Sequence, residues 1–308
     1  MLSRVANNLI WLDRYMERGN GILGLLKVNF YAHQDSPELF SWSPIIESFT
    51  SSENDFYTED TLECIHFMVF DVKNANSIVN IVTRARENAR SVQEHISREL
   101  WLCINSYYLF LTKKDLPQRL RDEDPVQLLE DLRKYHLIYN GTCDITQERG
   151  TPYCFMNVGK YLERVMLISD FTALKLEKIG NTSDSLEKTF YWKNLLLSIG
   201  GYQLYLKTYK STFNENHVIQ MVFQDKLFPR SVYYCIEKLN RHINKLIETG
   251  QLENNNLDFL LGKLESQIKY TTIENINSMG LNHFIEGIKD GVKNISLSIN
   301  AVYFSQNN

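Results

Sequence analysis

The sequence contains few of the residues that stabilise small extracellular domains. Five of its 308 residues are cysteine and six are proline. The cysteines are odd in number, are widely spaced and form no C-x-x-C pair, which argues against a disulfide framework and against a zinc knuckle. We therefore expect reduced thiols, most of them buried.

The residue patterns of common catalytic and cofactor sites are also missing. The seven histidines include no H-E-x-x-H pattern, and the nearest grouping, Glu94-His95 with Glu99, has a spacing that ordinary surface helices produce. The sequence has no Gly-rich phosphate loop and no convincing pairing of a nucleophile with a base. We expect neither a metal nor a cofactor, and no residue is assigned a catalytic role.

Long basic tracts and long uncharged apolar runs are absent too. The formal net charge is −4 and no Lys/Arg-rich block is present, so nucleic acid is not an expected partner. Asp13, Arg14 and Glu17 interrupt the first apolar segment, which therefore matches neither a signal peptide nor a membrane span. We expect a cytoplasmic protein with no membrane partner.

Helical periodicity dominates what is present. Hydrophobic residues make up 44% of the chain, enough for a large core, and strict alternation of apolar and polar residues is almost absent. The clearest helical face is formed by Ile78, Ile81, Val82, Ala85, Ala89, Val92 and Ile96. The sequence predicts an all-α, multi-helix, bundle-like fold, with breaks at residues 113–125 and 140–152, where charge, proline and glycine concentrate.

One short motif occurs twice. Arg14-Tyr15-Met16-Glu17-Arg18 near the start is matched by Lys160-Tyr161-Leu162-Glu163-Arg164 in the middle, and both lie in long apolar segments of helical period. This recurrence predicts two related helical halves, 1–150 and 151–308, packed as a single domain over 1–308.

Charged residues inside apolar helices need partners, because isolated buried charge is costly. One interpretation is that each Glu-Arg pair links helices within the core. A second is that the two pairs converge near a pseudo-twofold axis and form a pocket for an anionic or polar ligand. A surface salt bridge fits the motif least well.

Two further segments add candidate residues. Arg86 borders the apolar face of its helix and can reach inward, whereas Glu87 and Arg90 can form ordinary pairs on a solvated flank. Arg230, after Pro229, could cap a helix or hold a carboxylate. The candidate ligand-binding or structural ionic network is Arg14, Glu17, Arg18, Arg86, Glu87, Arg90, Lys160, Glu163, Arg164 and Arg230.

These segments together resemble the bacterial alpha-E family, named for a Glu-Arg motif on α-helices. The resemblance rests on the N-terminal Met1 to Ala6, the two Glu-Arg motifs, the Arg86-Glu87-Asn88-Ala89-Arg90 segment and Phe228-Pro229-Arg230-Ser231-Val232, which span nearly the whole chain. Phe228 stands where the family usually has Asn. Lys160 stands where the family usually has Arg. A lysine ammonium is a point charge and cannot form the bidentate hydrogen bonds of a guanidinium.

The resemblance implies the proteins with which the chain acts, and not a specific reaction. Members of the family are typically encoded beside, or fused to, a circularly permuted ATP-grasp peptide ligase, often with a transglutaminase-like peptidase and sometimes a proteasome-like one. Peptide synthesis or protein modification is the implied process, and a peptide or carboxylate is the implied ligand.

Two functions are consistent with these observations. In the first, the chain is a non-catalytic helical partner that binds the ligase or presents its peptide substrate, which suits its 17 tyrosines and 16 phenylalanines. In the second, it is an enzyme acting on an amide or peptide bond, with Glu17 and Glu163 as acid or base and arginines holding carboxylates. Guanidinium neighbours lower a carboxylate pKa, which favours the first.

Overall fold

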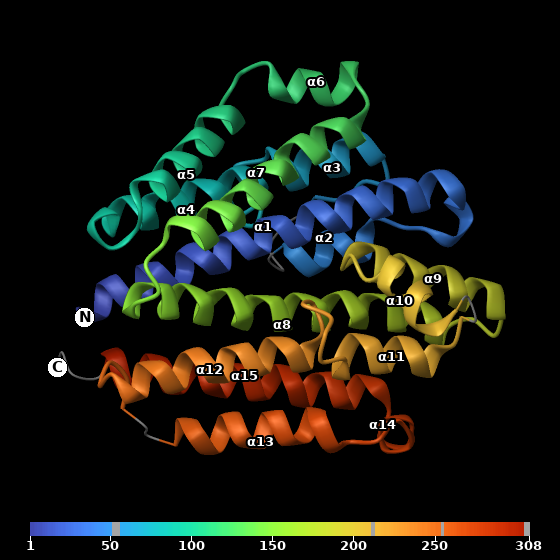
Figure 1. Cartoon of the computed structure of the whole chain (residues 1–308). Coiled ribbons are helices and arrows are strands. Elements are labelled where there is room, and N and C mark those ends of the chain that lie inside the picture. The colour runs from blue at the N-terminus through green and yellow to red at the C-terminus, as the bar shows by residue number, and fades with distance from the viewer. Residues whose placement is uncertain (51–55, 211–212, 254–255, 305–308) are drawn as a thin grey trace. The chain divides into compact units, whose positions relative to one another are not determined.

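The protein is almost entirely helical, as the sequence predicts. A computed structural model describes residues 1–50, 56–210, 213–253 and 256–304, and within these ranges it contains fifteen α-helices and no strand (Figure 1). The residues predicted to form an apolar face between Ile78 and Ile96 are all buried, and those from Ile78 to Ala89 share one helix. That helix ends at Ser91, so Val92 and Ile96 lie beyond it.

The chain divides into two compact units. The N-terminal unit comprises residues 11–152. Its helices are most of α1 (Ser3–Asp35), then α2 (Ser43–Phe49), α3 (Thr61–Val69), α4 (Ile78–Ser91), α5 (Arg98–Leu111), α6 (Leu116–Asp122) and α7 (Pro125–Thr146), with 3-10 turns at Pro37–Leu39 and Gln93–His95. Helix α4 packs against α5, α5 packs against α7, and α3 contacts α4 and α6.

The C-terminal unit comprises residues 1–10 and 153–308. Its helices are the first turns of α1, then α8 (Thr151–Gly180), α9 (Ser185–Ser198), α10 (Tyr202–Tyr209), α11 (Glu215–Gln224), α12 (Val232–Glu248), α13 (Leu257–Tyr270), α14 (Ile273–Met279) and α15 (Leu281–Phe304). Within this unit α12 packs against α11 and α13, and α15 against α13 and α14.

The packing pairs follow the same order in both units. The pairs α3–α4, α4–α5, α5–α7 and α6–α7 of the N-terminal unit correspond to α11–α12, α12–α13, α13–α15 and α14–α15 of the C-terminal unit. This is the order of packing pairs that a duplicated helical half would produce. The duplication itself, and the packing of the halves as one body, stay predictions.

Polar side chains begin many of these helices. A side-chain oxygen at the N-cap accepts a hydrogen bond from a backbone N–H of the first turn, which satisfies a donor that the helix leaves unpaired. The residues that do this are Asp60, Ser77, Ser97, Asp124, Asp184, Asn214, Ser231 and Thr272.

The two predicted breaks are partly helical. Residues 113–125 contain α6, because Pro117 lies in its first turn, where a missing N–H costs nothing. Helix α7 continues through Gly141 to Thr146, because a single glycine costs a helix only about 1 kcal/mol. The break before the second motif is therefore only Gln147–Gly150.

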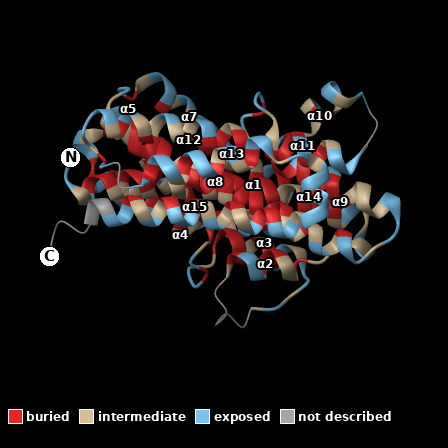
Figure 2. Cartoon of the chain, turned by 90° about the horizontal axis from the view of Figure 1, so that it is seen from below, coloured by how far each residue is buried: buried red, intermediate tan, exposed pale blue. Residues whose placement is uncertain are grey.

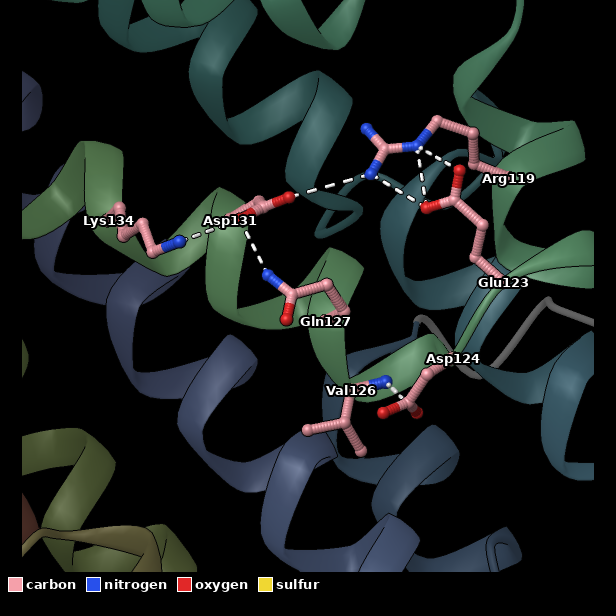
Figure 3. Close-up of polar contacts among 7 residues, drawn as sticks. All are labelled: Arg119, Glu123, Asp124, Val126, Gln127, Asp131 and Lys134. Carbon is pink, nitrogen blue, oxygen red and sulfur yellow. Dashed lines mark hydrogen bonds and ion pairs between the residues drawn. The ribbon is translucent and has the colours of Figure 1, made fainter.

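A network of ion pairs joins α6 to α7 (Figure 3). Arg119 donates from Nη2 to Glu123 Oε2 at 2.9 Å and lies 3.5 Å from Asp131 Oδ2 on α7. Asp131 also accepts from Lys134 at 2.8 Å and from Gln127 at 3.0 Å. The hydrogen bond from Lys134 is the largest favourable influence and holds the pKa of Asp131 below its usual value.

Candidate functional site

The first Glu-Arg motif lies on α1 in the N-terminal unit. Glu17 is buried, with 3% of its surface exposed. Arg18 donates from Nη1 to the Asn76 side-chain oxygen at 3.0 Å, and its guanidinium lies 6.0 Å from the centre of the Tyr15 ring. Arg14 lies over the Trp11 ring at 4.5 Å. The motif arginine therefore fastens the loop that precedes α4.

The second motif lies on α8 in the C-terminal unit and repeats this construction. Glu163 is also 3% exposed. Arg164 donates from Nη1 to the Pro229 carbonyl at 3.1 Å, and its guanidinium lies 5.4 Å from the Tyr161 ring centre. Here too the arginine holds a loop that precedes a helix, α12 in place of α4.

The two loops held by the arginines share their length and their ends. One runs from Asp71 to Ser77 and the other from Asp225 to Ser231. In each, the aspartate accepts from a backbone N–H two residues later, and the serine N–H donates to the carbonyl three residues earlier at 2.9 Å. Each serine then caps its helix.

This similarity was not recognised in the sequence, although a signal was present. Met68-Val69-Phe70 precedes the first loop and Met221-Val222-Phe223 precedes the second, so the internal similarity extends beyond the Glu-Arg motifs. Arg230 lies in the second loop, half-buried and next to the capping serine, and Ser231 rather than Arg230 supplies the cap.

The α4 candidates separate into an inward and an outward group. Arg86 donates from Nε to the Asn105 side-chain oxygen on α5 at 2.8 Å and lies 4.5 Å from the centre of the Tyr108 ring. Glu87 accepts from Arg86 at 2.8 Å and lies 3.7 Å from Arg90, and both Glu87 and Arg90 are largely exposed. Arg86 therefore links two helices, whereas Arg90 forms a surface pair of small energetic value.

Buried polar groups of α7 lie beside the first motif. His136 is fully buried, and its Nε2 is 3.1 Å from the Tyr107 hydroxyl. Burial lowers the pKa of His136 to about 3, although the charge of Glu17 and the Met16 backbone act in the opposite direction. A Cβ on Gly19 would come within 2.7 Å of the His136 ring. The imidazole is thus neutral at pH 7 and tightly enclosed.

A second buried pair lies nearby on the same two helices. The Tyr139 hydroxyl donates to Asp13, and both side chains are buried. Burial first, and then the Asp13 charge, raises the pKa of Tyr139. Sequence reasoning placed Asp13 on a polar side of α1 but did not find this partner. The donor for this carboxylate comes from α7 and is brought to it only by the packing of the two helices.

An ionic contact in the C-terminal unit joins α8 to α15. Lys289 Nζ lies 3.1 Å from Asp170 Oδ1. Burial raises the pKa of Asp170, Lys289 opposes this, and the charge of Glu163 adds to the rise. The charge of Lys160, the first residue of the second motif, contributes to lowering the pKa of His242 on α12.

Among the described residues, no group of three or more His, Cys, Asp and Glu side chains is arranged to hold a metal ion. Burial raises the pKa of Cys64 to about 12 and that of Cys103 to about 11, so both thiols are protonated at neutral pH. Each motif is placed within its own unit, and their convergence on a shared pocket stays a prediction.

None of the described helices combines the length and the apolar character needed to cross a membrane.

Comparison with known proteins assigns nearly the whole chain to one family. The model of a family described as a predicted alpha-helical domain with a conserved ER motif matches residues 1–304. Two uncharacterized proteins, one from Mycobacterium bovis and one from Mycobacterium tuberculosis, are each 21% identical over 265 residues, which is 79% of this chain and 30% of theirs. The chain therefore matches about a third of the length of these relatives. No solved structure is significantly similar to it.

Proposed function

The chain belongs to the Alpha-E family, and from this membership we propose that it is a non-catalytic helical protein that docks onto another polypeptide. The observation that carries the proposal is an exposed aliphatic face on α5 and α7. Its members are Leu102, Leu109, Ile138 and Ile145, which are 49%, 56%, 54% and 85% exposed. Exposed apolar side chains that form a contiguous patch often mark a site where another protein binds.

The two residues of each helix lie on one face of that helix. Leu102 and Leu109 are seven residues apart on α5, and Ile138 and Ile145 have the same spacing on α7, so each pair shares a helical face. The helices run antiparallel, because Ser97 contacts Thr146 at 2.7 Å while Tyr107 contacts His136 at 3.1 Å.

The opposite side of this pair is buried. Leu100, Ile104 and Leu111 on α5, and Leu132 and His136 on α7, are buried, so the aliphatic face points away from the core of the unit. Both helices carry buried as well as exposed residues along their length (Figure 2). Covering the face would remove several aliphatic side chains from water, which is the main source of association energy.

The proposed partner is the ATP-grasp-type ligase, or the transglutaminase-like or proteasome-like peptidase, that the family resemblance implies. The relatives support a protein partner, because the aligned region is only 30% of their length and the remainder offers further chain beside it. The process is then peptide synthesis or protein modification in the cytoplasm, with this chain as a scaffold. The placement of Glu17 and Glu163, both almost fully buried, supports this role more than the alternative of an amide-bond enzyme.

Capture of the tagged chain from its own host, followed by native mass spectrometry, tests the proposal. We expect an ATP-grasp ligase or one of these peptidases in stoichiometric amounts. The variant Leu109→Glu/Ile138→Glu should reduce its recovery at least about tenfold, since central apolar contacts dominate interface energies. Leu186→Glu, at a 78% exposed position of α9, is the matched control and should retain it.

The proposal is wrong if the ligase and the peptidases are absent from the captured material, or if both variants retain them equally. Activity of the assembled system lost in a folded Glu17→Gln variant that still binds the partner would instead revive the amide-bond enzyme.

A further inference from the structure

Helix α12 carries a stripe of basic residues on one face. Lys238, Arg241, His242 and Lys245 follow the spacing i, i+3, i+4 and i+7, which places them together on the helix surface. Arg241 and Lys245 are exposed, whereas Lys238 and His242 are half-buried. These four residues are called the basic stripe below.

Aromatic rings of α8 form the wall beside the basic stripe. The His242 ring lies 5.6 Å from the Tyr153 ring and 6.1 Å from the Tyr161 ring, edge-on to the first and nearly parallel to the second. On α12 itself, the Lys238 ammonium lies 4.9 Å from the centre of the Tyr234 ring. Two residues of the stripe, His242 and Lys238, are thus in contact with aromatic rings.

The electrostatics of this surface are positive. Burial, then the charges of Arg241, Lys245, Lys238 and Lys160, lower the pKa of His242 to about 4. Cations of α8 and α12 therefore surround the His242 imidazole, which is neutral at pH 7. Two exposed carboxylates of the same helix border the stripe: Glu237 precedes Arg241 by four residues and Glu248 follows Lys245 by three, so each neighbours one of its cations.

We propose that the basic stripe, with Tyr153, Tyr161 and Lys160, binds an acidic peptide segment. Lys238 and Lys245 are separated by roughly 10 Å along the helix at 1.5 Å per residue, a distance that about three residues of extended chain span. Several carboxylates in succession would meet several cations, while the tyrosine rings pack against the peptide backbone and side chains. Nucleic acid fits less well, because the chain as a whole has a net charge of −4.

This inference deepens the proposed function, because it gives a scaffold of a peptide-ligating system a site for the peptide. It uses the C-terminal unit, whereas the aliphatic face lies in the N-terminal unit. The two can therefore fail separately. Peptide binding needs no partner protein, and partner capture needs no basic stripe.

Fluorescence anisotropy with the full chain and a labelled, end-capped tetraglutamate peptide tests the site, with tetraglutamine as the uncharged comparison. We expect saturable binding of tetraglutamate only, weakened by added salt. Lys238→Glu/Arg241→Glu should weaken it at least about tenfold, since two attractive contacts become repulsive. Lys207→Glu/Lys263→Glu makes the same change of charge at exposed positions of α10 and α13 and should leave it nearly unchanged.

Three results would overturn the proposal. One is equal weakening by the two double variants, which would indicate only general charge attraction. Another is absence of tetraglutamate binding by the unmodified chain. The third is tighter binding of inorganic phosphate or of a short single-stranded oligonucleotide than of the peptide. If the charge-reversed variant does not fold, as judged by circular dichroism, Lys238→Gln/Arg241→Gln replaces it and should still weaken binding severalfold.

Discussion

At the residue scale, the polar side chains of the motif are constrained from several directions. Arg18 and Arg164 each contact an aromatic ring of their own helix and a loop of their own unit. Glu17 lies buried near the neutral His136. Such groups stabilise the native state only while all their partners are in place, because an unpaired buried polar group costs as much as the bond it loses.

The titration of His136 predicts a pH dependence of stability. Its pKa is near 6.5 in the unfolded chain and about 3 in the folded one, so the unfolded state gains a proton first as pH falls. Stability from this residue is complete above pH 6.5 and is lost between pH 6.5 and 3, by about 2 kcal/mol between pH 7 and pH 5. Urea unfolding of His136→Gln at both pH values should show a smaller decrease by that amount.

His283→Gln, at an exposed position of α15, is the control for this experiment and should keep the unmodified pH dependence. An unaltered decrease in His136→Gln would mean that the imidazole is accessible to protons in the folded state.

The buried glutamates predict a large effect of truncation. Glu17→Ala removes a buried carboxylate together with its interactions with the surrounding groups, so the free energy of unfolding should fall by about 3 kcal/mol or more. Glu87→Ala removes an exposed carboxylate of α4 and should cost no more than about 1 kcal/mol. Thermal melts of the two variants make the comparison, and equal shifts would place Glu17 in contact with water.

At the element scale, close packing of helices decides where small residues are required. A Cβ on Gly159 of α8 would lie 2.0 Å from the carbonyl oxygen of Ile10 on α1. Because that neighbour is backbone, no rotamer change can relieve the contact. Glycine at this position therefore lets the first turns of α1 lie directly against α8 within the C-terminal unit.

Two glycine substitutions with opposite expected effects on the free energy of unfolding test this packing. Gly159→Ala should destabilise the protein by about 2–3 kcal/mol, because the helices must separate. Gly141→Ala in α7, where open space surrounds the new methyl group, should stabilise it by about 0.5–1 kcal/mol through helix propensity. Urea unfolding measures both, and a neutral Gly159→Ala would contradict the close contact.

At the scale of the whole molecule, the chain consists of two compact units with the same order of packed helices. The boundary between them falls within α1, since residues 1–10 belong with residues 153–308. The long first helix is thus part of both units. The proposed docking face of aliphatic residues lies in one unit and the proposed peptide site in the other.

This division predicts where loosening will appear. Ser77→Ala and Ser231→Ala each remove one helix cap, worth about 1 kcal/mol, from equivalent positions before α4 and α12. Hydrogen exchange should accelerate mainly in the N-terminal unit for the first variant and mainly in the C-terminal unit for the second. Equal acceleration throughout both units in either variant would show instead that the molecule opens as one body.

The sequence by itself determined the helical class and the family. The 3.6-residue period of apolar residues is a local property that survives in any packing of the helices, and the Glu-Arg motifs are recognisable as strings. It also placed Glu17 and Glu163 inside apolar helices, and both are buried. Helix ends were less predictable, because Pro117 and Gly141 are compatible with helix when their surroundings permit it.

Only the tertiary structure decided what the motif residues touch. Asn76 and Pro229 lie 58 and 65 positions from their arginines, and such contacts depend on how the helices pack, not on local spacing. The same holds for the enclosure of His136 and for the exposure of Leu109 and Ile138, since apolar residues within one helix become core or surface only when a neighbouring helix covers them.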